Sequence, residues 1–351
     1  MKSKVYFKSI SSSVDRKECL VGILNRLKED LKEFEQGEIV GIKTTIGDSG
    51  DVGYVKPELI RLIVDELNNN KAKPFVFDTN VIYKGMRMNA VDHLNLAYSK
   101  GFLPQKLGCP FIIADSVFGT DSKVIKLGLK NLKEIRVPSL ISVLENLIVV
   151  THITGHMLTG YAASIKNVGM GMASRAGKQI QHSSLKPHVI KNKCTLCRCC
   201  VNICPAGAIS EKEGKSFINA SVCLGCGECI SACKFDAIHI NWQEDVNKLV
   251  ERTVEYAWGI LSCIKRRIFI NFAFDITKEC DCMADDNPRI IEDVGIFASR
   301  DILAVDKACF DVLTRKEDVF AKHQNTKAHL HQFTYAKEIC LGHLDYELVE
   351  L

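Results

Sequence analysis

Residues 193–240 read KCTLCRCCVNICPAGAISEKEGKSFINASVCLGCGECISACKFDAIHI, and the rest of the chain has to accommodate this stretch. It holds two runs of four cysteines with the same spacing, C-x2-C-x2-C-x3-C, and the second run lies 29 positions after the first. The cysteines of the two runs are Cys194, Cys197, Cys200, Cys204, Cys223, Cys226, Cys229 and Cys233. Three closely spaced thiolates can bind one face of an iron–sulfur cube but cannot reach its fourth vertex, so the fourth cysteine of each run binds the other cluster.

The spacing therefore predicts two [4Fe–4S] clusters with crossed ligands. For the first cluster the predicted ligands are Cys194, Cys197, Cys200 and Cys233. For the second cluster they are Cys223, Cys226, Cys229 and Cys204. Zinc sites usually stop at two cysteine pairs with a long spacer, and they do not account for two full runs. The stretch resembles the bacterial dicluster ferredoxin domain, which implies electron transfer, and the ninth cysteine within it, Cys199, is expected to be a small packed side chain.

The composition is that of an ordinary globular protein with room for two domains. The chain has 351 residues, of which 46% are hydrophobic and 25% charged. A net charge of +4 is too small to indicate nucleic-acid binding. No secretory signal and no apolar run long enough for a membrane span are visible in the sequence. Because thiolate clusters require a reducing compartment, we expect a cytoplasmic protein of an anaerobic or micro-oxic cell.

Short apolar strands alternate with helices on both sides of the cysteine-rich stretch. This pattern predicts an α/β fold: a parallel or mixed sheet body with helices on both faces, plus an inserted ferredoxin-like unit. The expected parts are residues 1–188 and 242–351 for the body and residues 189–241 for the unit. The expected strands are 39–45, 75–78, 111–115, 133–137, 147–151, 267–272 and 291–297. The expected helices are 17–35, 57–67, 90–99, 138–144, 246–263 and 301–313, with weaker helical signals over 338–351.

Polar residues follow several of these strands where the strands end. They are Asp78, Thr79, Asn80, Asp115 and residues 151–156. In parallel sheets the carboxyl ends of the strands meet at one edge and tend to line a site. The sequence therefore predicts a polar site at this edge.

Residues 151–182, THITGHMLTGYAASIKNVGMGMASRAGKQIQH, form a second unusual stretch. Glycine and alanine are dense, and His152, His156, Lys166 and His182 are spread among them. Small residues let the backbone approach a ligand closely, while histidine and lysine supply metal or nucleophile chemistry. A tightly packed helix–sheet region with hydrogen-bonded histidines is the alternative interpretation.

Cys280, Asp281 and Cys282 form a third constellation. Two thiols one residue apart can face the same soft metal ion. Our hypothesis is an additional metal or redox site formed by Cys280 and Cys282 with His152 and His182. The alternative is a pair of reduced cysteines that pack near the clusters.

Several stretches resemble one widespread family. Residues 78–93, 155–171, 279–282 and 293–313, together with the cysteine-rich unit, identify the chain as a member of the family named domain of unknown function 362. The resemblance implies an α/β domain with ferredoxin clusters, but it does not indicate a reaction.

Residues 155–166, GHMLTGYAASIK, are also similar to the active-site segment of lactate racemase, the nickel-pincer enzyme. This similarity implies that His156 takes part in proton and hydride chemistry, that Lys166 anchors the pincer nucleotide and that His182 binds nickel. Arg87 and His93 are candidates for the other catalytic position of such a site.

The leading hypothesis is an iron–sulfur redox protein whose clusters pass low-potential electrons to an active site in its own α/β domain, with His156 and Lys166 as the catalytic candidates. Its partners would be a ferredoxin- or flavodoxin-like donor, or an oxidoreductase, and a small-molecule substrate. A non-catalytic electron-transfer or adaptor subunit is the second hypothesis, and it predicts an apolar surface patch in place of a polar site. The third is a racemase-like, metal-dependent isomerase in which the clusters are structural.

Overall fold

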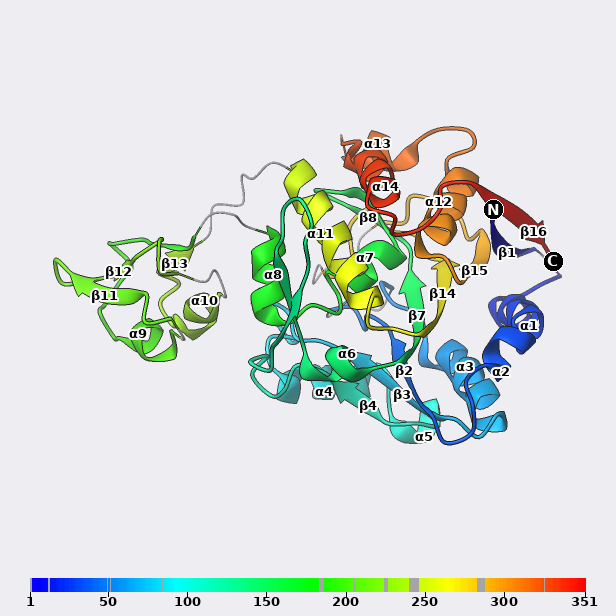
Figure 1. Ribbon diagram of the computed structural model, residues 1–351, viewed down its shortest axis with the longest axis horizontal. Coiled ribbons are helices and arrows are strands. Elements are labelled where there is room, and N and C mark those ends of the chain that lie inside the picture. The colour runs from blue at the N-terminus through cyan, green and yellow to red at the C-terminus, as the bar shows by residue number, and fades with distance from the viewer. Residues whose placement is uncertain are drawn as a thin grey trace.

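The computed structural model describes the chain except for residues 1, 12, 49, 51, 84, 183–185, 205, 224–226, 240–245, 283–287 and 325. An eight-stranded sheet forms the centre, in the order β16–β1–β15–β14–β7–β2–β3–β4 (Figure 1). The five strands from β14 to β4 run parallel to one another, whereas β15 is antiparallel to both of its neighbours. The strands are β1 (Ser3–Ser9), β2 (Ile39–Lys43), β3 (Lys73–Asp78), β4 (Phe111–Ile113), β7 (Asn146–His152), β14 (Arg266–Ala273), β15 (Gly295–Ser299) and β16 (Tyr346–Glu350).

Helices cover both faces of this sheet, because its strands are apolar on both sides. In β7, Leu147 and Val149 belong to one core while Ile148 and Val150 belong to the other. The first core is closed by α6 (Ser139–Val143), α7 (Ser164–Gly169), α8 (Arg175–His182), α11 (Val246–Leu261), α12 (Ile302–Leu313), α13 (Val319–Gln324) and α14 (Ala328–Glu338). The second is closed by α1 (Arg16–Arg26), α2 (Lys28–Lys32), α3 (Pro57–Asn69), α4 (Ala90–Ser99) and α5 (Pro104–Leu107). The predicted α/β class with a mixed sheet is confirmed.

Three predicted elements differ in the structure. The expected strand 133–137 forms β6 (Glu134–Val137), which pairs with β5 (Lys123–Lys126) as a separate antiparallel hairpin outside the central sheet. The weak helical signals over 338–351 were misleading, since this segment contains the edge strand β16 paired in parallel with β1. The expected helix 17–35 is divided at Leu27 into α1 and α2. In each case tertiary pairing or packing outweighs the local periodicity.

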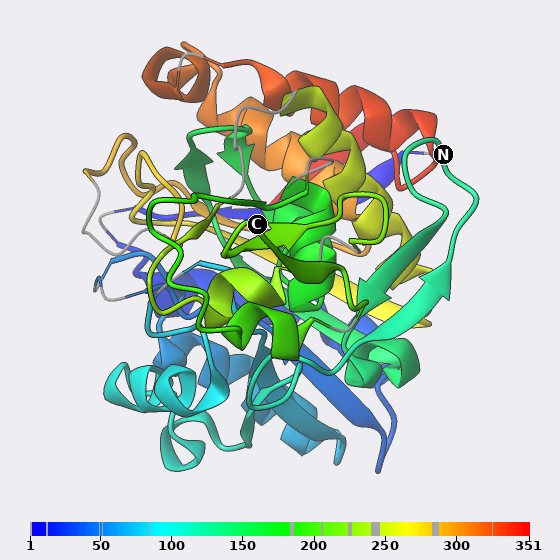
Figure 2. The same cartoon turned by 90° about the vertical axis from the view of Figure 1, so that its left-hand side faces the viewer.

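The cysteine-rich stretch forms a lobe at the side of the body that carries α8 (Figures 1 and 2). Its described elements are β10 (His188–Val189), α9 (Cys199–Ile203), β11 (Ile209–Lys212), β12 (Lys215–Ile218), α10 (Glu228–Ala232) and β13 (Ile238–His239). The two pairs of short strands, β10–β13 and β11–β12, are antiparallel. The division of the chain at residues 189 and 241 stays a prediction.

The 29-residue repeat of the sequence is also a repeat of the backbone. Arg198 caps α9 in the left-handed conformation with φ 60°, and its counterpart Gly227 caps α10 with φ 76°. Gly207 and Asp236, which are also counterparts, have φ values of 58° and 51°. Since non-glycine residues rarely adopt positive φ, these matched positions indicate two copies of one structural unit.

Glycines between residues 155 and 177 allow close backbone packing. A Cβ atom at Gly169 would lie 2.1 Å from the carbonyl oxygen of Thr253 in α11, and one at Gly177 would lie 2.3 Å from the carbonyl oxygen of Arg136. A Cβ atom at Gly155 would meet a backbone oxygen of the loop after β14 at 2.0 Å. The packing interpretation of these glycines is therefore supported by their surroundings.

We expect Gly169→Ala to destabilise the protein by about 1–3 kcal/mol, because α7 and α11 would have to separate to admit the methyl group. Gly128→Ala is the matched control, since a Cβ atom there has nothing within 4 Å, and its effect should stay within about 0.5 kcal/mol. Denaturant unfolding followed by circular dichroism measures both variants. Equal midpoints for the two variants would contradict the packing argument.

Candidate functional site

The lobe contains a small pocket lined by four cysteines. These are Cys194, Cys197, Cys200 and Cys233, so three come from the first run and one from the second. They are the four residues predicted to bind the first cluster. The remaining lining is largely apolar, and apolar surroundings suit a thiolate-bound iron–sulfur group. The residues present thus fit the predicted group, and its binding stays a prediction.

Backbone amides point at the sulfur atoms of both runs. The N–H of Ala208 donates to Cys204 Sγ at 3.3 Å, and that of Ala237 donates to Cys233 Sγ at 3.2 Å. Burial acts to raise the pKa of Cys194. Hydrogen bonds from the backbone N–H and the side chain of Ser216 outweigh burial, so the pKa is lowered. Such donors stabilise thiolates, which are the ligand form.

The second predicted set is described only in part. Cys229 is buried, whereas Cys204 and Cys223 are half-buried. Cys226 lies outside the described residues. The ligand set of the second cluster therefore stays a prediction that rests on the sequence repeat and on the matched backbone.

The carboxyl ends of β2, β3 and β4 carry a buried polar network in the body. Lys43 donates from Nζ to Asp78 Oδ1 at 3.1 Å, and neither side chain is exposed. The Asn80 side-chain amide donates to Asp115 Oδ1 at 3.0 Å, and Lys178 of α8 donates to the carbonyl oxygen of Asn80 at 2.6 Å. Burial lowers the pKa of Lys178 to about 8. The polar residues predicted at the strand ends therefore lie together. Lys43 and Lys178, which connect them, were not identified from the sequence pattern.

Arg87 extends this network from the loop after β3. Its guanidinium lies 3.7 Å from Asp78 and 3.7 Å from Asp48, and its Nη2 donates to the hydroxyl of Tyr83 at 2.5 Å. His93 of α4 lies 3.5 Å from Asp78. Burial acts to raise the pKa of Asp78, but Lys43 and the neighbouring cations hold it well below its ordinary value.

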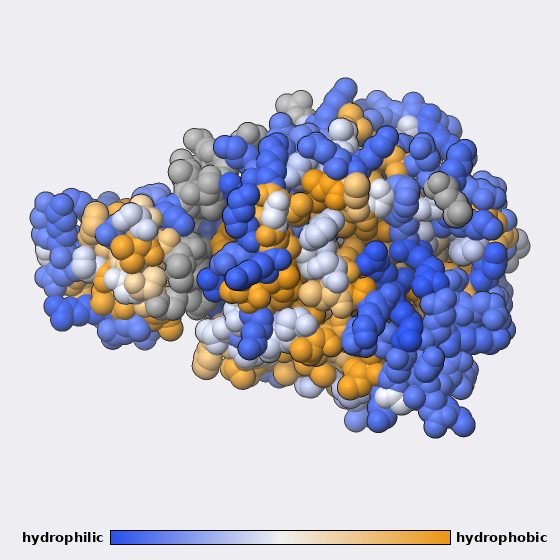
Figure 3. Space-filling model, viewed as in Figure 1, coloured by the Kyte–Doolittle hydropathy of each residue, from blue (hydrophilic) through white to orange (hydrophobic). Residues whose placement is uncertain are grey.

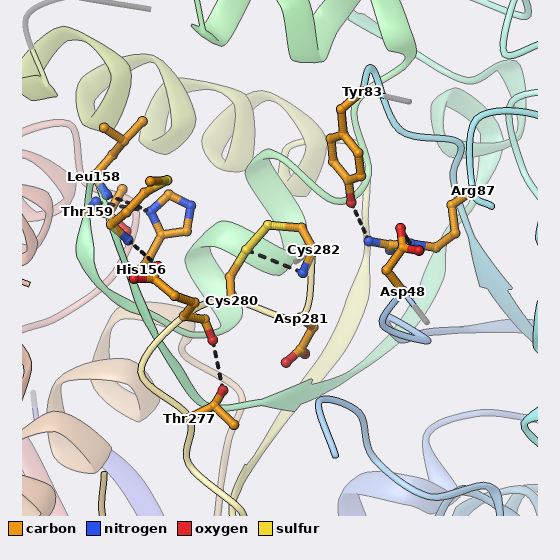
Figure 4. Close-up of a disulfide and its surroundings, with 12 residues drawn as sticks. Asp48, Tyr83, Arg87, His156, Leu158, Thr159, Thr277, Cys280, Asp281 and Cys282 are labelled. Carbon is orange, nitrogen blue, oxygen red and sulfur yellow. Dashed lines mark hydrogen bonds and ion pairs between the residues drawn. A yellow bond between two sulfur atoms is a disulfide. The ribbon is translucent and has the colours of Figure 1, made fainter. Parts of the chain in front are cut away.

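His156 ends the first strand of a hairpin made of β8 (Thr154–His156) and β9 (Gly160–Ala162). Its Nδ1 accepts hydrogen bonds from the backbone N–H groups of Leu158 at 3.2 Å and Thr159 at 3.1 Å (Figure 4). Burial lowers the pKa of His156 well below its ordinary value, and the positive charges of Lys166 and His182 lower it further. The ring is therefore neutral, and the two hydrogen bonds assign its proton to Nε2.

Cys280 and Cys282 lie beside this histidine, in the loop after β14. They form a disulfide, and their Cα atoms are 5.3 Å apart. One ligand atom each from His156, Cys280 and Cys282 lie within 4.8 Å of one another (Figure 4). Among the described residues, these three side chains are the group whose ligand atoms lie close enough together to hold a metal ion.

His152 is not in this group, contrary to the predicted set of Cys280, Cys282, His152 and His182. Its Nδ1 lies 2.9 Å from Asp281 Oδ1, and its Nε2 lies 2.8 Å from the carbonyl oxygen of Phe274. Burial acts to lower the pKa of His152, but the Asp281 carboxylate outweighs it and the pKa is raised. Both ring nitrogens are thus used in holding the loop after β14, and His156 takes the place expected for His152. His182 is near enough to act on the charge of His156, yet it is not in the group either.

Lys166 of α7 lies near enough to His156 to act on its charge. Burial lowers the pKa of Lys166 to about 8, Asp281 opposes this shift and Arg87 adds to it. The structure thus brings both catalytic candidates, His156 and Lys166, into one region with Cys280 and Cys282.

The fold and these sites define an α/β protein with a cysteine-rich, ferredoxin-like lobe. The family described as "Domain of unknown function (DUF362)" matches residues 40–311, which is more than half of the chain, so the chain belongs to this family.

Curated relatives match short segments. The chain is 49% identical over 39 residues to an uncharacterized ferredoxin of Methanocaldococcus jannaschii, covering 11% of this chain and 24% of that protein. It is 39% identical over 62 residues to the electron transport protein HydN of Escherichia coli, covering 15% and 35%. The chain thus spans about a quarter to a third of these relatives.

Among solved structures, the lactate racemase apoprotein of Thermoanaerobacterium thermosaccharolyticum aligns with 14% identity and a TM-score of 0.42, covering 97% of this chain and 58% of that one. None of the helices within the described residues has the length and apolar character needed to cross a membrane.

We expect Lys166 to react with an amine acylating reagent with a midpoint near pH 8, because its neutral form is the nucleophile. The acylation rate of Lys166 should rise about tenfold per pH unit below pH 8 and level off above it. The rates of exposed lysines, whose ordinary pKa is about 10.4, should continue to rise. Peptide mass mapping after acylation between about pH 6 and pH 10 measures the rates of Lys166 and of the exposed lysines in one digest. A Lys166 rate that keeps rising with the exposed lysines up to pH 10 would contradict the lowered pKa.

Proposed function

We propose that the protein is a cytoplasmic iron–sulfur redox protein that holds two [4Fe–4S] clusters in its lobe and transfers low-potential electrons to the site at the edge of its own sheet. The observation that carries this proposal is the cavity lined by Cys194, Cys197, Cys200 and Cys233, which joins both cysteine runs. When bound, each cluster supplies one-electron transfer. The relatives named as ferredoxins and electron transport proteins support the same class of function.

Helix α8 connects the lobe to the site. A Cβ atom at Gly227 would lie 3.1 Å from Gln179 Oε1, so the cap of α10 packs directly on this helix. The residue before Gln179 is Lys178, which donates to the carbonyl oxygen of Asn80 at the strand ends. This short path through one helix supports electron transfer from the lobe into the body.

The surface of the lobe supports docking of a redox partner. Among its described residues, four large apolar side chains are exposed, and Figure 3 shows hydrophobic residues on this part of the surface. They are Ile203, Phe217, Val222 and Phe235. Small exposed apolar areas of this kind are typical of transient protein contacts. A ferredoxin- or flavodoxin-like donor, or an oxidoreductase subunit, is the partner that we propose.

The body favours an enzyme over an adaptor subunit. The body exposes large apolar side chains such as Phe118 and Val143, but it also buries Lys43, Arg87 and Lys178 at the strand ends, which a docking face alone does not require. Burying charged side chains costs free energy even when they are paired, and shifted pKa values gather at functional positions. We therefore propose a small-molecule substrate that reacts near His156 and Lys166.

The crossed ligand sets give the sharpest test. Cys233→Ser should lose the same cluster as Cys194→Ser, although the two residues lie in different runs, because both line one cavity. Each variant should keep about half of the eight irons and eight sulfides and lose one of two EPR signals in the reduced state. Cys204→Ser and Cys223→Ser should instead lose the other signal.

Cys199→Ser is the matched control, since this cysteine lies in α9 beside the predicted ligands and is not one of them. It should keep all eight irons. Loss of different signals in Cys194→Ser and Cys233→Ser would refute the crossed assignment, and wild-type protein without iron would refute the proposed function.

A further inference from the structure

The Cys280–Cys282 pair lies beside His156, and the proposed function leaves its role open. The pair is held in place from two sides. The N–H of Gly155 donates to the carbonyl oxygen of Thr277 at 2.8 Å, and this bond ties the loop to β8. On the other side, His152 binds Asp281, the residue between the two cysteines. The loop that carries the pair is thus fixed on both sides, with Cys280 buried and Cys282 half-buried.

The contacts favour sulfur redox chemistry over metal binding. Nδ1 of His156 already accepts two backbone N–H groups, so Nε2 carries the proton and offers no lone pair to a metal ion. The carboxylate of Asp281 is turned to His152. The described residues therefore leave two sulfur ligands for a metal ion, whereas structural sites for soft metals usually have four.

The same contacts suit a reversible disulfide. The Cα separation of 5.3 Å lies within the usual range for bonded cysteines. The N–H of Cys282 donates to Cys280 Sγ at 3.4 Å, and Figure 4 shows the His156 ring beside the two sulfur atoms. Donors at these places stabilise a sulfur atom that carries negative charge, as a thiolate does after reduction.

We infer that Cys280 and Cys282 form a two-electron dithiol–disulfide centre that collects electrons delivered one at a time by the lobe. In the step, the bond between the two sulfur atoms breaks, two electrons are taken up from the lobe and one proton from solvent, and one thiol and one thiolate form. The reductant is a low-potential one-electron donor that acts through the two clusters, so this inference rests on the proposed function. His156 is a positioning residue for the sulfur that becomes charged.

The test is an anaerobic reductive titration of the whole protein with titanium(III) citrate. Wild-type protein should take up two electrons per chain more than Cys280→Ser and Cys282→Ser, while all three keep the same iron, sulfide and EPR signals. Cys263→Ser, a half-buried cysteine away from the site, is the matched control and should match the wild type. Alkylation with mass mapping should label Cys280 and Cys282 only after reduction.

A second readout separates a positioning role from simple packing. His156→Ala should leave the electron count unchanged and shift the midpoint potential of the pair to a more negative value, because the reduced form loses its donor. An unchanged potential would remove His156 from the proposal.

Two results would overturn the dithiol centre itself. One is equal electron uptake by the wild type and both cysteine variants. The other is one metal ion per chain beyond the cluster iron that disappears in both variants. If the lobe holds no clusters, the proposed function fails. In that case titanium(III) would leave the pair oxidised, while dithiothreitol would still expose both thiols.

Discussion

The parallel pairing of β7 with β14 is the constraint on which the rest of the structure depends. These strands come from opposite sides of the cysteine-rich lobe in the sequence, and their register runs from Asn146 with Arg266 to His152 with Phe272. The pairing places the residues after both strands at one edge of the sheet. The hairpin that carries His156 and the loop that carries Cys280 and Cys282 meet for this reason.

The buried charges at the neighbouring strand ends have a different origin. Lys43 and Asp78 compensate each other, and removing one partner would leave the other as an isolated buried charge. A hydrophobic pair of the same volume would stabilise a sheet edge at least as well. Their presence at this edge is therefore better explained by the binding of polar groups than by stability.

The sequence was most informative where the chemistry is local. Cysteine spacing predicts ligand sets because one turn of backbone fixes the thiolates, and the matched φ values of Arg198 and Gly227 show how closely the backbone follows. The choice between His152 and His156 depends on the β8–β9 hairpin and on Asp281, which is distant in sequence. Lys43 could not be identified as part of the site either, because a lysine that ends an apolar strand resembles any exposed strand end.

The internal repeat of the lobe also gives it a direction. Gly227 packs on Gln179 of the body, whereas its counterpart Arg198 is exposed and pairs with Glu211. Two halves of nearly equal backbone thus have unequal surroundings, one facing protein and the other facing solvent. If electrons pass through the lobe as we propose, the copy anchored on α8 delivers them to the body and the solvent-facing copy receives them from a partner.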